Sequence, residues 1–332
     1  MGGDFGPEVT VAAAANILKR RTDVNLILVG LEDQLRSHLQ KHNLEVSERL
    51  SIQHASEIVA MDEAPSQALR KKKDSSMRVA INLVSEGKAN AAVSAGNTGA
   101  LMATAKFVLK TLPGIDRPAI MSALPNTIGH THMLDLGANV DSSADHLFQF
   151  AVMGSVTVSA VDNIESPRVG LLNVGSEAMK GNAQVKAAEP LLQNSGLNYI
   201  GFVEGDDIFN GTVDVVVCDG FVGNISLKST EGVAKMITHF MRESFSKNIF
   251  TKIIGLLAIP VLKSFKKRVD HRRYNGASLL GLKDIVIKSH GGADTYSFSN
   301  AIKVAILEVE KSVPQQIDSH LDTLLEKQAS NG

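Results

Sequence analysis

The sequence predicts an α/β protein with a doubly wound, mostly parallel sheet, that is, a sheet with helices on both of its faces. Short β-rich runs alternate along the chain with longer helical patterns, and most of these runs end in glycine or a small polar residue. Three of the runs, VNLILV, VGLLNV and VDVVVC, are almost continuously apolar, as expected of strands that helices cover on both sides. We therefore expect one sheet to form the core.

Candidate strands follow one another through most of the chain. The three apolar runs lie in Val24–Val29, Arg168–Val174 and Val213–Cys218, and two shorter β-rich runs are Ala119–Ala123 and Tyr199–Val203. Glycine-rich turns follow five of the runs, namely those that end at Val93, Leu136, Val174, Cys218 and Lys288. Such turns end a strand and allow a helix to begin after it. In chain order the strands are Val24–Val29, Asn90–Val93, Ala119–Ala123, His132–Leu136, Arg168–Val174, Tyr199–Val203, Val213–Cys218 and Ile285–Lys288.

Length and composition place the chain among ordinary globular proteins. Its 332 residues suffice for one large α/β domain or two small ones, and 44% apolar with 21% charged residues argues against wholesale disorder. No repeat with a period of about 20–50 residues and no linker rich in Pro, Ser or Gly divides it. We therefore expect a single domain over residues 1–332, from which residues 242–273 protrude as basic amphipathic helices.

Charge, cysteine content and hydropathy exclude several classes of function and location. Lys plus Arg (34) and Asp plus Glu (35) give a net charge of −1, so no overall basic field exists to bind nucleic acid. The single cysteine, Cys218, forbids an internal disulfide. The glycine-rich and acidic N-terminus is unlike a secretory signal, and the longest apolar stretch, residues 253–262, is too short to span a bilayer. We expect a cytoplasmic protein.

Residues 242–273 depart from the even charge balance. They hold nine Lys and Arg against two acidic residues, a net charge of +7, which leaves −8 for the rest of the chain. Pro260 interrupts the helical pattern, and Leu262, Phe265 and Val269 continue the apolar spacing beside basic residues. Before the proline, one apolar helical stripe holds Phe245, Ile249, Phe250, Ile253, Leu256 and Leu257, and the opposite face holds Ser244, Lys247, Asn248, Thr251, Lys252 and Gly255. This basic amphipathic pair fits a membrane surface, and it also fits packing on the domain or on a second subunit.

Glycine-rich turns are the main candidates for chemistry. They span residues 94–99, 135–139, 173–177, 219–224 and 289–292. We expect these turns to converge at the carboxyl edge of the sheet, where exposed N–H groups and helix N-termini bind phosphate or a developing oxyanion without a metal. Turn glycines also serve merely to allow positive φ angles and close packing, so the argument rests on the five turns together.

Other chemistries find little support in the motifs. The chain has neither G-x-G-x-x-G nor a P-loop, and it has no G-x-S-x-G nucleophile elbow. Cys218 ends a β-rich run, where a small buried side chain is the expected role. His130 and His132 are the tightest pair of potential metal ligands, but no third ligand has a useful spacing, so we expect no metal site.

Lys180 stands seven residues beyond a predicted buried strand, beside Gly181 and Asn182 and at the start of a helix. Its ammonium group fits a place in the loop cluster. Most lysines are simply solvated, however, so a surface role fits the same position.

Eight segments resemble, in order and across nearly the whole chain, the bacterial phosphate acyltransferase family, the acyl-ACP:phosphate transacylases. Each segment alone is a weak signal, but eight in register are highly specific. They are MGGDFGP (1–7), SAGNTGALM (94–102), GIDRPA (114–119), LDLGANVD (134–141), SPRVGLLNVGSE with KGN (166–177 and 180–182), DGFVGN (219–224), GASLLGLK (276–283) and SHGGAD (289–294).

The resemblance implies an acyltransferase that passes an acyl chain from acyl carrier protein to inorganic phosphate. A membrane glycerol-3-phosphate acyltransferase then consumes the acyl phosphate in phospholipid synthesis. The family further implies a Rossmann-like fold of the isocitrate and isopropylmalate dehydrogenase kind, and a homodimer at the inner face of the cell membrane. Direct attack of phosphate on a thioester needs no covalent intermediate and no cofactor, which agrees with the missing motifs.

Site residues follow from the same resemblance. Lys180 would neutralise phosphate and developing charge, and Asn224 would hydrogen-bond the thioester carbonyl. The residues that the resemblance implies for binding phosphate or the thioester are Asp4, Gly96, Asn97, Thr98, Gly99, Asn182, His290 and Gly291. The residues expected to contact a membrane or the carrier protein are Ile253, Ile254, Leu257, Lys263, Lys266, Lys267 and Arg268. Arg272 and Arg273 are further candidates for docking the acidic carrier protein.

The start of the sequence departs from the family pattern. Family members carry a short apolar strand before the MGGD motif, whereas this sequence begins at Met1 of that motif. Without that strand we expect a looser anchor for the loop that carries Asp4.

Three alternatives remain open. A coenzyme A-dependent phosphate acetyl- or butyryltransferase has related architecture and the same product chemistry. A decarboxylating dehydrogenase has a similar sheet, but it needs a divalent metal and an aspartate cluster that the sequence does not show. A non-catalytic membrane-binding scaffold would use the basic helices and leave the five glycine-rich turns unexplained.

Overall fold

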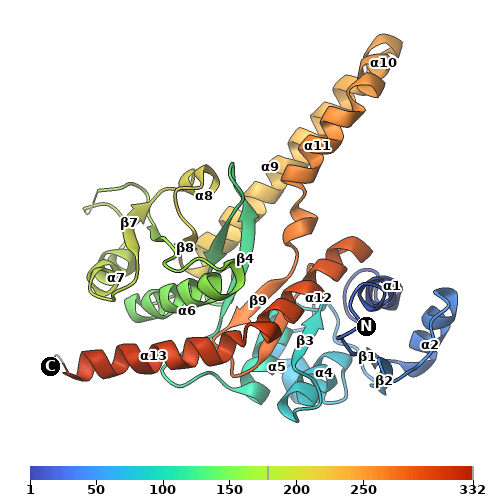
Figure 1. Ribbon diagram of the computed structural model, residues 1–332, viewed down its shortest axis with the longest axis horizontal. Coiled ribbons are helices and arrows are strands. Elements are labelled where there is room, and N and C mark those ends of the chain that lie inside the picture. The colour runs from blue at the N-terminus through green and yellow to red at the C-terminus, as the bar shows by residue number, and fades with distance from the viewer. Residues whose placement is uncertain (178, 331–332) are drawn as a thin grey trace.

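The computed structural model describes residues 1–177 and 179–330, in which ten strands form two sheets (Figure 1). The strands are β1 (Leu26–Gly30), β2 (Leu50–His54), β3 (Ala91–Ser94), β4 (Ala119–Pro125), β5 (His130–Leu134), β6 (Val169–Leu172), β7 (Tyr199–Val203), β8 (Val215–Val217), β9 (Ala277–Leu280) and β10 (Ile285–Lys288). The helices are α1 (Pro7–Leu18), α2 (Glu32–Lys41), α3 (Pro65–Lys71), α4 (Ser76–Ser85), α5 (Thr98–Leu109), α6 (Ala144–Asp162), α7 (Ala183–Gln193), α8 (Asp207–Asn210), α9 (Gly220–Ser246), α10 (Ile249–Leu257), α11 (Ile259–Val269), η1 (His271–Tyr274), α12 (Thr295–Glu310) and α13 (Val313–Ser330).

The main sheet has eight strands in the order β3-β10-β9-β4-β5-β8-β6-β7. The block from β5 to β7 is parallel, as is the pair β3 and β10. Between them, β9 and β4 pair antiparallel with each other and with both neighbouring strands. The mostly parallel sheet is confirmed, but β3 and β10 run opposite to the β5–β7 block, and this reversal determines where the loops lie.

All eight predicted strand runs overlap a strand of the structure, with ends that shift by a few residues. Tyr199–Val203 and Ile285–Lys288 match at both ends. Strand β5 covers His130–Leu134, two residues earlier than the predicted run His132–Leu136, because the residues after Leu134 turn away into a loop. The sequence analysis missed β2 and β9, whose runs of five and four residues are too short to distinguish by periodicity.

Helices cover both faces of the main sheet, as the apolar runs predicted. The three residues of β8 show the reason, since all of them are fully buried. Val215 and Val217 pack in the cluster that contains Phe150 of α6, whereas Val216 packs in the cluster that contains Leu101 of α5. Successive side chains of a strand point to opposite faces, so a strand buried on both faces must be apolar throughout.

The prediction of a single sheet is wrong, because β1 and β2 form a separate two-stranded parallel sheet. They pack with α1 and α2 around a small core of their own that includes Val11, Leu35 and Leu50. A cavity of about 500 Å³ separates β1 from β3 and is lined by residues of both strands together with Met1 and Gly2. The run Val24–Val29 was correctly predicted to form a strand, but β2, the strand with which β1 pairs, was not predicted.

The predicted basic helices leave the body of the protein as a long arm made of α9, α10 and α11 (Figure 1). Helix α9 ends at Ser246, and Asn248 caps the start of α10 with a capping box. Pro260 lies in the first turn of α11, so the predicted break at the proline is confirmed. Gly255 lies against Phe245, so its predicted place opposite the apolar stripe is wrong, because the chain turns back at Asn248. No described helix has the combination of length and hydrophobicity needed to cross a membrane.

Candidate functional site

The loop after β5 is built around the buried carboxylate of Asp135. That carboxylate accepts hydrogen bonds from the backbone N–H groups of Ile120 (2.9 Å), Ala138 (3.1 Å) and Asn139 (2.6 Å), and from the Asn139 side chain (3.0 Å). Burial raises the pKa of Asp135, against the effect of these donors. The sequence analysis did not single out Asp135, although the LDLGANVD motif contains it. Its role is to hold the loop in shape.

The start of α9 packs directly on this loop. The N–H of Gly220 donates to the Asn139 carbonyl at 2.8 Å, and Asp219 caps the helix by accepting from the N–H of Val222 at 2.9 Å. A side chain at Gly223 would collide with the Asp135 carbonyl, since an added Cβ would lie 1.9 Å from its oxygen. This close approach explains the glycine in DGFVGN and fixes the first turns of α9 against the β5 loop.

Asn224 lies exposed on the next turn of α9, beside Gly137. Gly137 has a φ of 118°, which favours glycine, and an added Cβ there would lie 3.3 Å from Cβ of Asn224. The neighbouring Cys218 is buried, and burial raises the pKa of its thiol well above the ordinary value. The predicted role of Cys218 as a small buried side chain is confirmed.

Lys180 lies on the loop after β6, at the same edge as Asn224, because β6 and β8 are adjacent parallel strands. Its ammonium nitrogen is 2.8 Å from Oε2 of Glu177, and the side chain is half exposed. The hydrogen bond to Glu177 raises the pKa of Lys180, so the group is a stable cation. Two residues later, Asn182 caps α7 by accepting from the N–H of Val185 at 3.0 Å. Asn182 therefore positions the loop that carries Lys180.

A second group of predicted residues surrounds the start of α5. The Asn97 side chain is buried and fully used within the loop: its oxygen accepts from the N–H of Ala100, and its amide nitrogen donates to the Met61 and Glu63 carbonyls at 2.9 Å each. It therefore shapes the loop, and we no longer expect its side chain to bind a substrate. Thr98 and Gly99 are exposed in the first helical turn, where backbone N–H groups have no partner within the helix.

The N-terminal loop and the loop after β10 join this second group. Gly2 lies so close to Gly96 that an added Cβ would be 2.9 Å from the Gly96 Cα. The backbone N–H of Asp4 donates to the Gly291 carbonyl at 3.0 Å, so the loop that carries Asp4 is anchored. His290 accepts from the N–H of Gly292 at Nδ1 (3.1 Å), so its neutral ring carries a proton on Nε2. Burial and nearby lysines lower the pKa of His290.

Two lysines that the sequence analysis missed belong to this group. Lys288 ends β10 with only 8% of its surface exposed and donates to the Ser289 carbonyl. Burial, and then the charge of Lys228 on α9, lower the pKa of Lys288 to about 8, with Asp4 acting in the opposite direction. A lysine at the end of an apolar strand, directly before SHGG, was the signal available in the sequence. We call Lys228, Lys288 and the neutral His290 the cationic cluster, after its two lysines.

The glycine-rich loops form two groups, so the expectation that all five meet at one carboxyl edge is wrong. The loops after β5, β6 and β8 share one edge, whereas β3 and β10 point the opposite way because β9 and β4 reverse the strand direction. Helix α9 connects the two groups. Asn224 lies in the first group, and Lys228, one turn later and about 6 Å along the helix, acts on Lys288 and His290 of the second.

Residues predicted to contact a membrane or carrier protein lie on the arm. Ile253, Ile254 and Leu257 expose 50%, 42% and 78% of their surface, and Lys263 and Arg268 are exposed as well. The side chains of Lys266 and Lys267 lie outside the part of the chain that is described. Arg272 instead pairs with Asp270 and Asp294 at 2.7 Å, which leaves its guanidinium committed within the protein.

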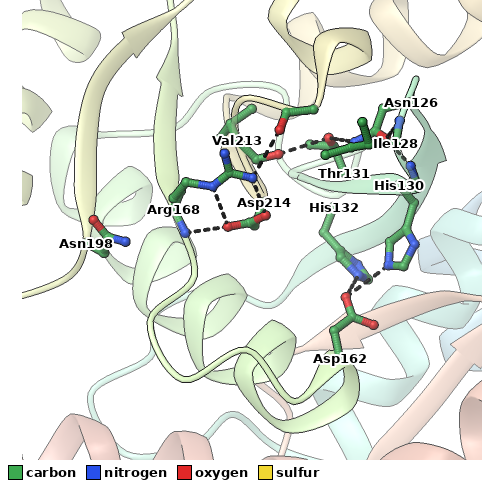
Figure 2. Close-up of polar contacts among 12 residues, drawn as sticks. Asn126, Ile128, His130, Thr131, His132, Asp162, Arg168, Asn198, Val213 and Asp214 are labelled. Carbon is green, nitrogen blue, oxygen red and sulfur yellow. Dashed lines mark hydrogen bonds and ion pairs between the residues drawn. The ribbon is translucent and has the colours of Figure 1, made fainter.

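Within the described residues, one cluster has the composition of a metal site, and it lies away from both loop groups. His130 and His132 of β5 meet Asp162 at the end of α6 (Figure 2). The sequence analysis expected no metal here because it found no third ligand, and Asp162 removes that reason.

Comparison with known proteins finds a family model and relatives that match nearly the whole chain. Residues 1–316 match a family model described as "Fatty acid synthesis protein". A phosphate acyltransferase from Nitrosococcus oceani is 63% identical over 325 residues, which cover 98% of this chain and 96% of that protein. Another from Alkalilimnicola ehrlichii is 62% identical over 325 residues, with 98% and 95% covered.

Solved structures support the fold. A EutD phosphotransacetylase from Staphylococcus aureus superposes with a TM-score of 0.61 at 17% identity, over 92% of this chain and 91% of that one. A phosphotransacetylase from Streptococcus pyogenes gives 0.61 at 18% identity over the same shares.

Proposed function

This chain belongs to the phosphate acyltransferase family, and from that membership we propose that it transfers an acyl group from acyl carrier protein to inorganic phosphate. A phosphate oxygen forms a bond to the thioester carbonyl carbon, and the bond from carbon to sulfur breaks. The carrier thiolate leaves and takes up the proton that the phosphate held. The products are acyl phosphate and the free carrier thiol. A glycerol-3-phosphate acyltransferase in the membrane would accept the acyl phosphate as the next step.

The cationic cluster is the proposed phosphate site, and its position carries the proposal. Lys288 is buried, so its charge is poorly solvated until an anion arrives. Lys228 and the Nε2–H of His290 supply further donors, and the exposed N–H groups of Thr98 and Gly99 lie at a helix N-terminus in the same loop group. Asp4 opposes the lysine charges and limits their mutual repulsion.

We place the thioester carbonyl at the first loop group, beside the turn of α9 that carries Asn224 and precedes Lys228. We assign the Asn224 amide as its hydrogen-bond donor, because Asn224 is exposed and lies beside the shaped loop at Gly137. Lys180 neutralises the charge that develops on the carbonyl oxygen and on the entering phosphate. For this role it exchanges its contact with Glu177, an exposed ion pair that stabilises the protein little. A phosphate in the cationic cluster then lies within about one helical turn of the carbonyl.

The arm is the proposed membrane surface. Its exposed Ile254 and Leu257 lie among basic side chains, the combination that binds an interface with anionic lipids. Acyl carrier protein would dock on the same basic side chains. The apolar residues of α9, among them Met236, Ile237 and Phe240, are about half exposed and form the proposed homodimer surface. These positions support peripheral attachment of a cytoplasmic enzyme to the inner membrane face.

The test is acyl phosphate release from palmitoyl carrier protein and inorganic phosphate, with palmitoyl coenzyme A in a parallel reaction. Product from the carrier protein at a kcat/KM well above that from coenzyme A is the expected result. Preference for coenzyme A would favour the phosphate acetyl- or butyryltransferase alternative. Absence of product from either donor, in protein that remains folded, would contradict the assignment.

A further inference from the structure

Two histidines and one aspartate meet at the edge of the sheet opposite Asn224. His130 starts β5 and His132 lies two residues further on, which puts them about 16 Å and about 10 Å from Asp135 along the strand. Figure 2 shows both imidazole rings pointing at the same carboxylate, that of Asp162. The Nε2 atom of each ring is 2.9 Å from Oδ2 of Asp162, and the three ligand atoms lie within 4.8 Å of one another.

The fold explains why these side chains converge. His130 and His132 are two residues apart on a strand, so both point to the same face of the sheet. Helix α6 packs against that face and ends at Asp162, since Asn163 adopts a left-handed conformation with a φ of 55°. The third ligand therefore comes from 30 residues further along the chain, which is why no spacing in the sequence revealed it.

Burial and charge make this cluster a defined site rather than a surface contact. The side chain of His132 is 10% exposed, that of Asp162 is 23% exposed and that of His130 is 34% exposed. Burial disfavours ionisation of Asp162, but the two histidine donors outweigh it and hold the pKa of this carboxyl below its usual range. The nearby Asp214 is neutralised by Arg168, whose guanidinium nitrogens lie 2.8 and 2.9 Å from its oxygens. Among the described residues, Asp162 therefore supplies the carboxylate that both rings contact.

Hydrogen bonding within the cluster is incomplete. One carboxylate oxygen receives both ring contacts, and Nδ1 of His132 is buried with no hydrogen-bond partner in the described part of the chain. The two rings lie edge to face with centroids 4.9 Å apart, so both Nε2 atoms are held around a single point. Such an arrangement is close to what a small cation requires.

We propose that Nε2 of His130, Nε2 of His132 and Oδ2 of Asp162 bind a divalent zinc ion, with water as the fourth ligand. Zinc prefers tetrahedral sites with nitrogen or oxygen at about 2.0–2.2 Å, which places neighbouring ligand atoms about 3.3 Å apart. The present contacts of 2.9 Å need to open by only a few tenths of an ångström. Imidazole with carboxylate suits zinc better than it suits calcium or magnesium.

The proposed ion fastens the start of β5 to the end of α6 and takes no part in acyl transfer. It lies far along β5 from the proposed catalytic residues, so this proposal stands whether or not the proposed function holds. Because Nδ1 of His132 has no acceptor among the described residues, we expect weaker binding than in a zinc site whose histidines are hydrogen-bonded at the second nitrogen.

The experiment measures zinc binding by titration calorimetry on the full chain, free of any histidine tag and stripped of metal beforehand. We expect one ion per chain and, at saturating zinc, a rise of about 2–5 °C in the Tm. Asp162→Asn and His132→Gln should each weaken binding at least about 10-fold. His42→Gln, which changes one exposed histidine at the end of α2, is the matched control and should bind as the parent chain does.

Cobalt(II) provides a second readout that needs no variant to fold. The parent chain should give the visible absorption of a four-coordinate cobalt ion, which zinc abolishes by displacement. Absence of both the heat and the absorption would overturn the proposal. So would equal zinc affinity in Asp162→Asn and His42→Gln, because binding would then be adventitious.

Discussion

Lys288→Met tests the proposed phosphate site most directly, because phosphate binding and folding place opposite demands on this lysine. Lys288 is 8% exposed, and burial followed by the charge of Lys228 lowers its pKa from 10.5 to about 8. A shift of that size means that the protonated form costs about 3 kcal/mol in the folded protein. Methionine has a similar length and no charge, so it removes this cost.

The sign of the pH dependence follows from the direction of the shift. Between pH 8 and 10.5 the unfolded chain holds more protons at this lysine than the folded chain, so stability rises with pH through that window. Below pH 8 the full cost is present. We therefore expect Lys288→Met to raise the free energy of unfolding by up to about 3 kcal/mol at neutral pH and to leave it unchanged at high pH.

Phosphate binding should respond in the opposite way. A hydrogen bond to a charged partner contributes about 1.5–3 kcal/mol, so the KM for phosphate should rise about 10- to 100-fold in Lys288→Met. In the parent enzyme, kcat/KM for phosphate should fall above pH 8 as Lys288 loses its proton, and the variant should lack this decline.

The assays are acyl phosphate release at varied phosphate and pH, and urea unfolding of the same proteins. Lys41→Met, an exposed lysine at the end of α2, is the matched control. An unchanged KM and pH profile in Lys288→Met would refute the phosphate role. A marked loss of stability would refute the argument from burial.

Three further predictions concern other parts of the molecule. Lys180→Ala should lower kcat for acyl phosphate formation about 10²- to 10³-fold and leave the Tm unchanged, and retained activity would remove Lys180 from the mechanism. Ile254→Glu or Leu257→Glu should release the folded protein from anionic vesicles in co-sedimentation, whereas continued binding would point to a protein partner for the arm. Glu308 is buried, accepts a hydrogen bond from Ser278, and has a pKa raised by burial from 4.5 to about 7, so the parent chain loses stability as pH rises through that range. Glu308→Gln should therefore be about 3 kcal/mol more stable above pH 7 and equal below pH 4.5 in urea unfolding, and equal stability above pH 7 would contradict the burial argument.

The candidate site was only partly predictable from the sequence. The structure packs the loops that carry Asp4, Gly96 and Gly291 together, and their role in binding phosphate or thioester stays a prediction. The structure does not favour the predicted binding role of the Asn97 side chain, because its amide nitrogen already donates hydrogen bonds to carbonyls within residues 60–63. Lys288 was overlooked although it ends an apolar strand, because its place beside Lys228 depends on tertiary packing.

Local patterns in the sequence determined the strands, the helical arm and the apolar character of the core. Apolar runs such as that of β8 specify a buried strand wherever its partners come from, because every side chain in them must leave water. The direction and order of the strands depended on long-range pairing. The antiparallel strands β4 and β9 reverse the sheet and divide the loops into two groups, and α6 brings Asp162 to two histidines 30 and 32 residues earlier. Such contacts join residues whose spacing carries no periodic signal, because hydrogen bonding between strands and packing of helices on them are satisfied only in the folded chain.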